Sequence, residues 1–475
     1  MKFSYLLAGL LFLTPLALAE GLPDLGDYSQ TILTPQDERR IGEEIMREIR
    51  GSGELVNDIE VADYVNTLGY HLATHSSDNQ QTFTFFVIND PTINAFALPG
   101  GFIGMHTGLI LNSRSESEMA SVLAHEIGHV VQRHMARMVA DQKRATLPSL
   151  GLMALSILMA RANPQLGSAA LMSTQAGMVQ RTLDFTREHE READRVGLQI
   201  LEASGFDTRA MPAFFETLMK GTRFIDGSAP SFLRTHPLST ERITDMRNRV
   251  EQTPYKQVLD SIEFHLVRAK LRAAEGNPAD TAKYFVNSLS EKKYSNESAQ
   301  RYGYALALIR ERNPEQAQQE LDKVRAIIPS HPMLETLAAQ ILQAQDRPLE
   351  ALTQYSNALN VYPKHRALIY GYAEILLLLN RNDEALKLLE DKQLAFPNDG
   401  YLYELQSRAY AAQGKDLLRH QAQGEAYYRG FNLNGAAEQM ELALKSGDGD
   451  FYQLSIVEAR LKQLQQQIND TKPLP

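Results

Sequence analysis

The stretch Ala124–His129 (AHEIGH) decides how the first half of the chain is organised, because two histidines stand four residues apart with a glutamate directly after the first. Each residue of an α-helix advances by about 100°, so His125 and His129 project from one face and can hold one ion between them. Neutral imidazoles suit Zn²⁺, and Glu126 lies beside that ion as a general base. The stretch therefore predicts a zinc-dependent endopeptidase with one Zn²⁺ per chain.

The residues around this motif predict the helix that the spacing requires. Ser115, with Glu118 three residues later, has the pattern of a capping box. An apolar stripe of helical period follows, made of Met119, Val122, Leu123, Ile127 and Val130. On the same helical wheel His134 lies about 140° away from the histidine pair, so we expect it to be a packed or surface histidine.

The N-terminus predicts export. Lys2, an apolar run over 6–13 and Ala17-Leu18-Ala19 have the order of a secretory signal peptide, with cleavage expected after Ala19. The alternative is an uncleaved anchor, although the run is shorter than the roughly 20 residues that a membrane span needs. We therefore expect the mature protein in the periplasm.

Composition narrows the class of protein. The chain has 475 residues, of which 43% are hydrophobic and 22% charged, which is ordinary for two or three soluble domains. It contains no cysteine, so a lipoprotein anchor and a disulfide framework are both excluded. The formal net charge of −10 argues against nucleic acid as a partner.

Ahead of the histidine motif we expect two packing helices, over about 35–49 and 58–74, and a strand over 82–89. The segment 94–101 then turns back into 102–106, which predicts a hairpin. Its edge strand could bind an extended peptide substrate through main-chain hydrogen bonds, or it could be purely structural. The candidate substrate-binding residues are Asn94, Ala95, Phe96 and Ala97.

Two uncharged pieces, 146–160 and 162–180, follow the motif and are rich in Met, Leu, Ala and Gly. Each is short for a membrane span. The segment 146–180 could be a lid over the active site, a surface for peripheral membrane or client contact, or a buried helical hairpin.

Charge returns at Arg187–Arg195 (REHEREADR). Glu190 and Asp194 share a helix face, so Glu190 could complete a His₂Glu zinc site while Asp194 hydrogen-bonds a ligand histidine. His189 points about 100° away and is a poorer candidate. A solvated helix surface remains the alternative for this charged run.

An HExxH motif followed some 60 residues later by ExEAD, with NAFALPGG (94–101) upstream, resembles the M48 family of zinc metallopeptidases over about 24–250. The resemblance implies an α+β, zincin-like fold of the gluzincin type. It also implies zinc ligands at His125, His129 and Glu190, with Glu126 as base and Asp194 in support. The chain lacks the flanking transmembrane helices of the family's membrane members and is similar to its exported branch.

The second half carries an internal repeat. Ala317, Ala351 and Ala385 are spaced by 34 residues, as are Pro329, Pro363 and Pro397, and Ala305, Ala339 and Ala373. This period is typical of tetratricopeptide repeats, although the chain has no tryptophan. We expect four clear repeats and a degenerate C-terminal part, stacked into an all-α superhelix with its own core and a concave protein-binding surface.

Together these patterns predict a mainly α protein with a signal peptide at 1–19, a metallopeptidase domain at 20–254 and a repeat domain at 255–475. An M48 domain joined to such repeats resembles the periplasmic β-barrel assembly-enhancing protease group. The resemblance implies quality control of misfolded or stalled exported and outer-membrane proteins, with the β-barrel assembly machinery as partner. The alternative is a chaperone or assembly adaptor without proteolysis.

Thr235-His236-Pro237 ends the predicted peptidase domain. A histidine before a proline in a loop is usually structural or exposed. Histidine-proline sequences at this place recur in the M48 family, so His236 is also a candidate fourth zinc ligand, which would close the site and make the enzyme latent.

Overall fold

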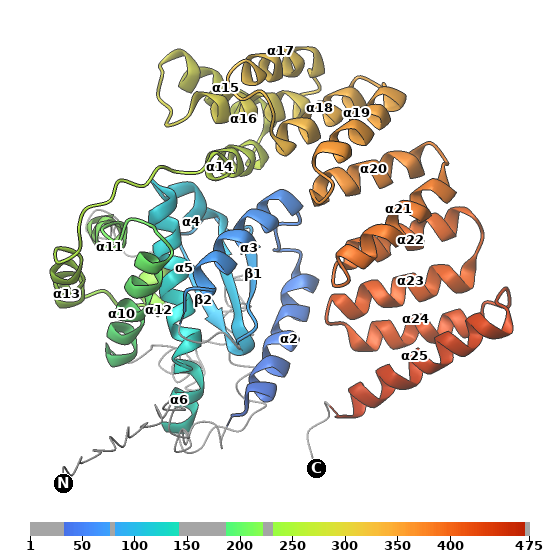
Figure 1. The fold of residues 1–475 in the computed structure, drawn as a ribbon, viewed down its shortest axis with the longest axis horizontal. Coiled ribbons are helices and arrows are strands. Elements are labelled where there is room, and N and C mark those ends of the chain that lie inside the picture. The colour runs from blue at the N-terminus through green and yellow to red at the C-terminus, as the bar shows by residue number, and fades with distance from the viewer. Residues whose placement is uncertain (1–32, 77–80, 142–186, 222–230, 471–475) are drawn as a thin grey trace, which may run out of the picture.

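A computed structural model describes residues 33–76, 81–141, 187–221 and 231–470, and most of them are helical (Figure 1). A small sheet and its helices form the first half, and an arc of helix pairs forms the second, which confirms the predicted fold class. The predicted signal peptide and the segment 146–180 lie outside the described residues. Within the described ranges, no helix combines the length and the apolar character that crossing a membrane requires.

The first two helices begin at side-chain caps. The Thr34 hydroxyl accepts a hydrogen bond from the Asp37 amide, and the Asp37 carboxylate accepts one from the Thr34 amide, at the start of α2 (Pro35–Ser52). Asp58 caps α3 (Ile59–Ala73) in the same way through the amides of its first turn. Both packing helices are therefore confirmed.

The sheet has three strands in the order β1-β3-β2. β1 (Thr84–Ile88) runs parallel to β3 (Phe102–His106), and β2 (Ala95–Leu98) pairs with β3 antiparallel. The 3₁₀ turn η1 (Pro99–Gly101) joins β2 to β3. Glycine is required at position 101 for two reasons: its φ is +80°, and a Cβ there would lie 2.1 Å from the Thr82 carbonyl oxygen. The predicted hairpin is confirmed, and β2 lies at one edge of the described sheet.

A central helix, α5 (Glu116–Val131), carries the histidine motif and packs against β2, α3, α10 and α11. Ser115 caps it by accepting from the Glu118 amide. Among the residues that the structure describes, this half also contains α4 (Thr107–Asn112), α6 (His134–Asp141), α10 (Arg187–Ala203), α11 (Ala210–Gly221), α12 (Ser231–Thr235) and α13 (Thr240–Val250). Because α5 is covered on all these sides, its histidines are held in a rigid interior.

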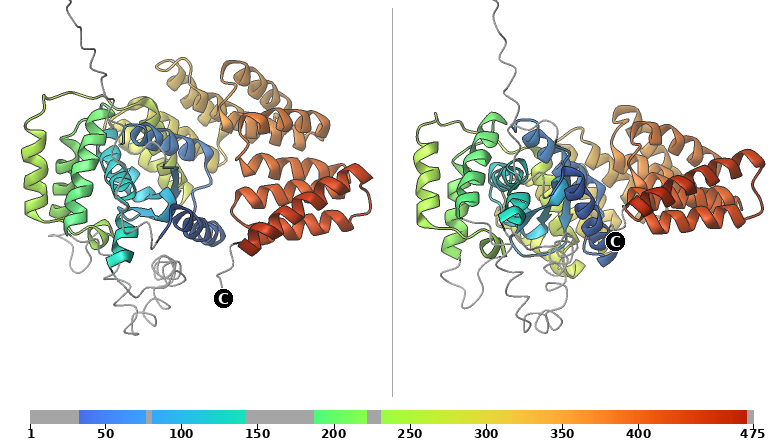
Figure 2. Two further views of the ribbon diagram at one scale, coloured as in Figure 1. Left: turned by 60° about the horizontal axis from the view of Figure 1, so that its bottom comes forward. Right: turned by 90° about the horizontal axis from the view of Figure 1, so that it is seen from below.

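The repeats follow as packed helix pairs, and the alanines that define the 34-residue period are all fully buried where the helices cross. The predicted four clear repeats correspond to α14–α21, and four more helices continue the arc in Figures 1 and 2. Their bounds are α14 (Ile262–Ala274), α15 (Pro278–Ser290), α16 (Glu297–Arg310), α17 (Pro314–Arg325), α18 (Pro332–Ala344), α19 (Pro348–Val361), α20 (Arg366–Leu378), α21 (Asn382–Ala395), α22 (Gly400–Ala412), α23 (Asp416–Arg429), α24 (Leu433–Lys445) and α25 (Phe451–Asp470).

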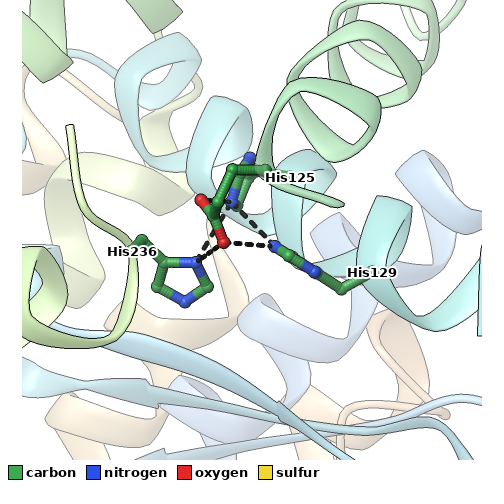
Figure 3. A group of neighbouring side chains, drawn as sticks. His125, His129 and His236 are labelled. Atoms are coloured by element: carbon green, nitrogen blue, oxygen red, sulfur yellow. Dashed lines mark hydrogen bonds and ion pairs between the residues drawn. The ribbon is translucent and has the colours of Figure 1, made fainter. Parts of the chain in front are cut away.

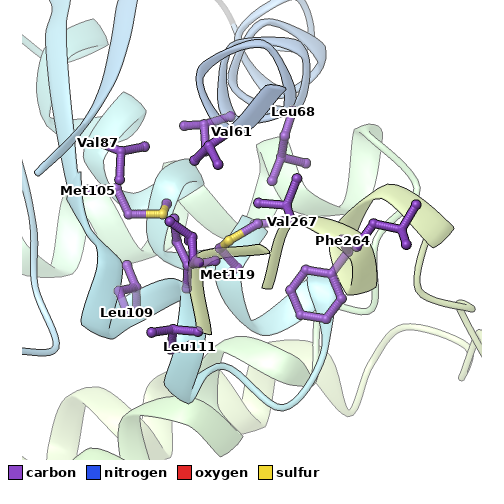
Figure 4. Close-up of a cluster of buried hydrophobic side chains, with 14 of the residues drawn as sticks. Val61, Leu68, Val87, Met105, Leu109, Leu111, Met119, Phe264 and Val267 are labelled. Atoms are coloured by element: carbon purple, nitrogen blue, oxygen red, sulfur yellow. The ribbon is translucent and has the colours of Figure 1, made fainter. Parts of the chain in front are cut away.

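The first repeat helix shares its core with the peptidase half, which differs from the expected separate core. Phe264 and Val267 of α14 are fully buried in one cluster with Val61 of α3, Met105 of β3 and Met119 of α5 (Figure 4). The same cluster runs on through α16 to α18. The apolar face of α14 therefore completes the peptidase core as well as starting the repeats.

Farther along, the arc touches the peptidase half at two more places. His365 and Arg366 at the start of α20 contact Glu60 and Asp63 of α3. Phe431, between α23 and α24, packs edge-on against Phe102 with ring centroids 5.7 Å apart. These contacts hold the repeats against the face that carries α2, α3 and the start of β3.

Candidate metal centre

The site forms where α5 and α10 cross at small residues. A Cβ on Gly128 of α5 would lie 3.0 Å from the Ala193 carbonyl oxygen, and a Cβ on Gly197 of α10 would lie 3.0 Å from the His125 amide nitrogen. The glycines let the two backbones approach closely. The motif side chains of α5 consequently face the acidic side chains of α10.

Four buried residues bring ligand atoms together at this crossing. One possible ligand atom from each of His125, His129, Glu190 and His236 lies within 4.8 Å of the others, and all four side chains are buried. The two motif imidazoles face each other with their Nε2 atoms 3.0 Å apart. Glu190 reaches both of them, with its Oε2 3.5 Å from His125 Nε2 and its Oε1 3.4 Å from His129 Nε2 (Figure 3).

His236 enters the cluster from the loop that follows α12. Its Nδ1 lies 3.3 Å from His125 Nε2 and 3.0 Å from Glu190 Oε1, and its Nε2 lies 3.4 Å from Glu126 Oε1. The ring stacks on Phe232 with centroids 4.7 Å apart. The structure places His236 among the candidate ligands and not at the surface, while the structural role that the sequence also allowed stays open.

Glu126 carries the clearest mark of an incomplete environment. Its side chain is fully buried, and neither carboxylate oxygen makes a hydrogen bond of good geometry with any described residue. Burial raises the pKa of Glu126, an effect that nearby His236 and His125 oppose. A buried carboxylate beside three imidazoles and a second carboxylate fits a site that holds a cation and a water, and the donor set is that of a Zn²⁺ site.

Asp194 and Arg242 support the first histidine. Asp194 Oδ1 lies 3.1 Å from His125 Nδ1, and its two oxygens accept from Arg242 Nε and Nη2 at 2.7 and 2.8 Å. Arg242 Nη1 lies 2.8 Å from Glu190 Oε2 and donates to the Pro237 carbonyl. One guanidinium therefore connects the His236 loop to both Glu190 and Asp194 of α10. The sequence gives Arg242 no motif of its own, so this role is visible only in the fold.

Neighbouring positive groups and hydrogen bonds keep Glu190 and Asp194 ionised. Burial raises the pKa of Glu190, but His236, His125 and His129 outweigh it and hold that pKa well below its usual range. Asp194 follows the same pattern, because hydrogen bonds from His125 and Arg242 lower its pKa more than burial raises it. Burial lowers the pKa of His129 to about 3, so its imidazole is neutral. A charged carboxylate and a neutral imidazole are the forms that bind a metal.

Two further histidines lie next to the cluster and not in it. His134 is fully buried, with its Nδ1 2.9 Å from His129 Nδ1, and His189 stacks on His134 with ring centroids 4.5 Å apart. The prediction that His134 is packed or at the surface is confirmed, because it is packed, and the residue it packs against is a candidate ligand. The helical wheel missed this contact because α5 ends at Val131 and the chain changes direction before His134.

The edge strand lies beside this centre. β2 packs on α5, and the Ala97 backbone is close enough to Glu126 to lower its pKa slightly. Asn94 precedes the strand, and its carbonyl accepts from the His106 amide of β3. The predicted substrate-binding residues Ala95, Phe96 and Ala97 are therefore in β2, and Asn94 is just outside it.

Comparison with known proteins agrees with this geometry. Residues 60–250 match the description of peptidase family M48, and residues 342–409 match the tetratricopeptide repeat. The matched range contains all four candidate ligands, Glu126 and Asp194. The chain is 36% identical over 157 residues to the mitochondrial metalloendopeptidase OMA1 of Arabidopsis thaliana, which covers 33% of this chain and 29% of that protein.

Two bacterial relatives match over most of their length. The beta-barrel assembly-enhancing protease of Escherichia coli (strain K12) is 34% identical over 457 residues, which is 96% of this chain and 93% of that protein. The putative beta-barrel assembly-enhancing protease of Vibrio cholerae is 34% identical over 419 residues, with coverage of 88% and 86%. The chain is therefore a metalloprotease with tetratricopeptide repeats, and it belongs to peptidase family M48.

Proposed function

We propose that this M48 protease uses one Zn²⁺ bound by His125, His129 and Glu190, and that Glu126 is its general base. The observation that carries the proposal is the set of buried donor atoms within 4.8 Å of one another, next to a glutamate whose oxygens have no good hydrogen bond among the described residues. Zn²⁺ at such a site would polarise the scissile carbonyl and lower the pKa of a water molecule.

The protein's own groups then divide the work. The Glu126 carboxylate accepts a proton from the attacking water and then donates it to the leaving amine. The raised pKa of Glu126 suits both proton transfers. Asp194 accepts from His125 Nδ1 and keeps its Nε2 free to bind the metal. Arg242 keeps Asp194 and Glu190 ionised and in position.

Substrate binding follows from the edge strand. Within the described ranges β2 pairs with β3 on one side and with no strand on the other, where an extended peptide could be added next to α5. Main-chain hydrogen bonds depend little on side chains. We therefore propose that unfolded or misassembled exported proteins, including outer-membrane proteins, are the substrates, and that the enzyme works in the periplasm.

The repeats are the proposed client and partner surface, with the outer-membrane β-barrel assembly machinery as candidate partner. A hollow of about 430 Å³ in the repeats is lined by residues that include Leu377, Leu378 and Arg408. Leu378 is 66% exposed there, and exposed apolar side chains beside a charge are common at protein-binding surfaces. This hollow also favours a second function, in which the repeats promote assembly without cleavage. The boundaries 20–254 and 255–475 stay a prediction.

One variant tests the enzyme and separates the two functions. In Glu126→Gln the amide replaces the base while the three ligands stay, so zinc content should equal that of wild type and casein cleavage should fall by several orders of magnitude. Near-normal cleavage by this variant would remove Glu126 from the mechanism. Binding of an unfolded outer-membrane protein that survives in Glu126→Gln would show that the repeats act without proteolysis.

His236 is the proposed regulatory ligand. Its Nδ1 lies as close to the ligand atoms as they lie to one another, so it can fill the position that a catalytic water needs. A loop side chain can be withdrawn when a client or partner binds, provided that the partner prefers the open state. The resting enzyme would then be latent.

A further inference from the structure

The chain reverses direction immediately after the second motif histidine. α5 ends at Val131, and Arg133 adopts φ +50°, which a non-glycine residue rarely does. Its guanidinium donates to the Leu33 carbonyl at 2.8 Å and to Glu38 at 3.0 Å, and these bonds hold the turn. As a result α6 starts at His134, whose ring points back toward α5.

His134 sits between a candidate ligand and a carboxylate. Its Nδ1 lies 2.9 Å from His129 Nδ1, and its Nε2 lies 3.2 Å from Glu192 Oε2. Arg137, one turn further along α6, donates to the same Glu192 oxygen at 2.8 Å. The His134 side chain is fully buried and stacks on His189 at a ring angle of 20°, so its orientation is fixed.

The donor and acceptor at each of these atoms follow from chemistry. His129 presents Nε2 to the cluster, so that atom carries the lone pair and Nδ1 carries the proton. His134 Nδ1 must then accept this proton, which puts the proton of His134 on Nε2, where Glu192 accepts it. These contacts of Glu192, His134 and His129 agree on one set of protons, and that set points the lone pair of His129 Nε2 toward the cluster.

We propose that His134 is a positioning residue that fixes the tautomer and ring angle of His129 through this chain. Asp194 positions His125 in the same way, because Asp194 Oδ1 lies 3.1 Å from His125 Nδ1. α10 thus supports both imidazoles, directly for His125 and through His134 for His129. Such partners usually contribute a factor of about 10 to 100 in metal affinity. The inference rests on the proposed zinc site.

The test compares two replacements of His134 in the full-length protein. In His134→Phe a ring still stacks on His189 but cannot accept the His129 proton, so zinc affinity, measured by competition with a chelator, should fall by about 10- to 100-fold. In His134→Asn the amide oxygen takes nearly the place of Nδ1 and should restore most of that loss. The absorption spectrum of the Co²⁺-substituted protein should change in His134→Phe and return toward wild type in His134→Asn.

A matched control is His331→Phe. His331 is also buried and paired with a carboxylate, Glu263, but it caps α18 in the repeats, so its loss should leave zinc affinity unchanged. If His134→Phe fails to fold, Glu192→Ala is the second variant, because Glu192 keeps 24% of its side chain exposed and tolerates truncation. A several-fold loss of zinc affinity is expected there, with exposed Glu188→Ala as its control.

The outcomes are distinct. Wild-type zinc affinity and an unchanged Co²⁺ spectrum in His134→Phe would overturn the positioning role while leaving the proposed zinc site intact. Equal losses in His134→Phe and His134→Asn would also overturn it, because packing alone would then explain the effect. Absence of zinc binding by the wild-type protein would instead remove the proposed function on which the inference rests.

Discussion

Two of the places where the described structure buries charged side chains are arranged in opposite ways. At the junction of α3 with the repeats, Glu60 accepts from Lys270 at 2.5 Å and pairs with His365 at 2.9 Å, so both of its oxygens have partners. At the metal centre, imidazole Nε2 atoms face each other and both Glu126 oxygens lack a good partner among the described residues.

The difference separates stability from function. A buried charge without a partner costs several kcal/mol, so folded proteins keep such groups where they serve a purpose. The junction balances its own charges and holds two halves of the chain together. The metal centre concentrates imidazole and carboxylate atoms that fit an added cation. Substitutions at the two places should therefore fail in different ways, and four experiments test this.

The largest expected effect is at the metal centre. Glu190→Ala removes the only carboxylate among the four donors in the described site, so zinc content should fall close to zero and casein cleavage should fall by about a thousandfold or more. Zinc by atomic absorption and cleavage rates measure the two effects. Exposed Glu188→Ala is the control from the same helix. Full zinc content in Glu190→Ala would mean that another residue is the third ligand.

A substitution at the junction of α3 with the repeats should lower the stability of the protein without changing its zinc content or its cleavage rate. Glu60→Ala removes one of the two carboxylates that contact the buried ammonium of Lys270 and leaves Asp58 at 2.6 Å, which should cost about 1–3 kcal/mol of unfolding free energy. Zinc content and cleavage of a short peptide should stay near wild type in the protein that remains folded. Urea unfolding measures the loss, with exposed Glu44→Ala as control. A loss of zinc at full stability would contradict the separation of the two places.

The pH dependence of stability sharpens the same point. Burial raises the pKa of Glu60, but Lys270 and His365 lower it more, to about 2 from a usual 4.5. Because the folded-state pKa is depressed, this group stabilises the fold above about pH 4.5, and the contribution, up to about 3 kcal/mol, is lost as the pH falls from 4.5 toward 2.

Urea unfolding of wild type and Glu60→Gln between pH 6 and pH 3 checks this window. The difference in stability between the two proteins should be constant above about pH 5 and should shrink below it. A difference that keeps one value over the whole range would show that the Glu60 charge does not stabilise the junction.

The smallest expected effect belongs to His236. If its ring occupies the water position at rest, His236→Ala should raise casein cleavage, and about a tenfold rise needs only about 1.4 kcal/mol of preference for the closed state. Zinc content should stay at wild-type level because three ligands remain. An unchanged or lower rate with zinc still bound would assign His236 to structure or to transition-state stabilisation.

The sequence predicts best what depends on a single helix. His125, His129, Glu190 and Asp194 were predicted because each pair lies one helical turn apart, and the structure brings the two pairs together at the α5–α10 crossing. The buried alanines of the repeats are predicted by a different period, the 34-residue spacing of the repeat itself. Both patterns are periodic, and a period survives in the sequence whatever the tertiary fold.

Features that depend on where a helix stops were not predictable in this way. His134 lies against His129 only because Arg133 turns the chain, and no residue pattern announces an arginine at positive φ. Arg242 reaches Asp194 from a helix that lies 48 residues away in sequence. Phe264 and Val267 have the spacing of any repeat helix, so nothing in the sequence says that their partners are in α3 and α5.

The core that α14 shares with the peptidase half also sets an order in time. All four candidate ligands precede Phe264 in the chain, so a chain made from its N-terminus has every donor of the metal centre before it has the side chains that close the core around α5. Until α14 has been made, the apolar surface of α3, β3 and α5 that it will cover remains exposed to water. The peptidase half therefore cannot reach its final packing before the first repeat helix has been made.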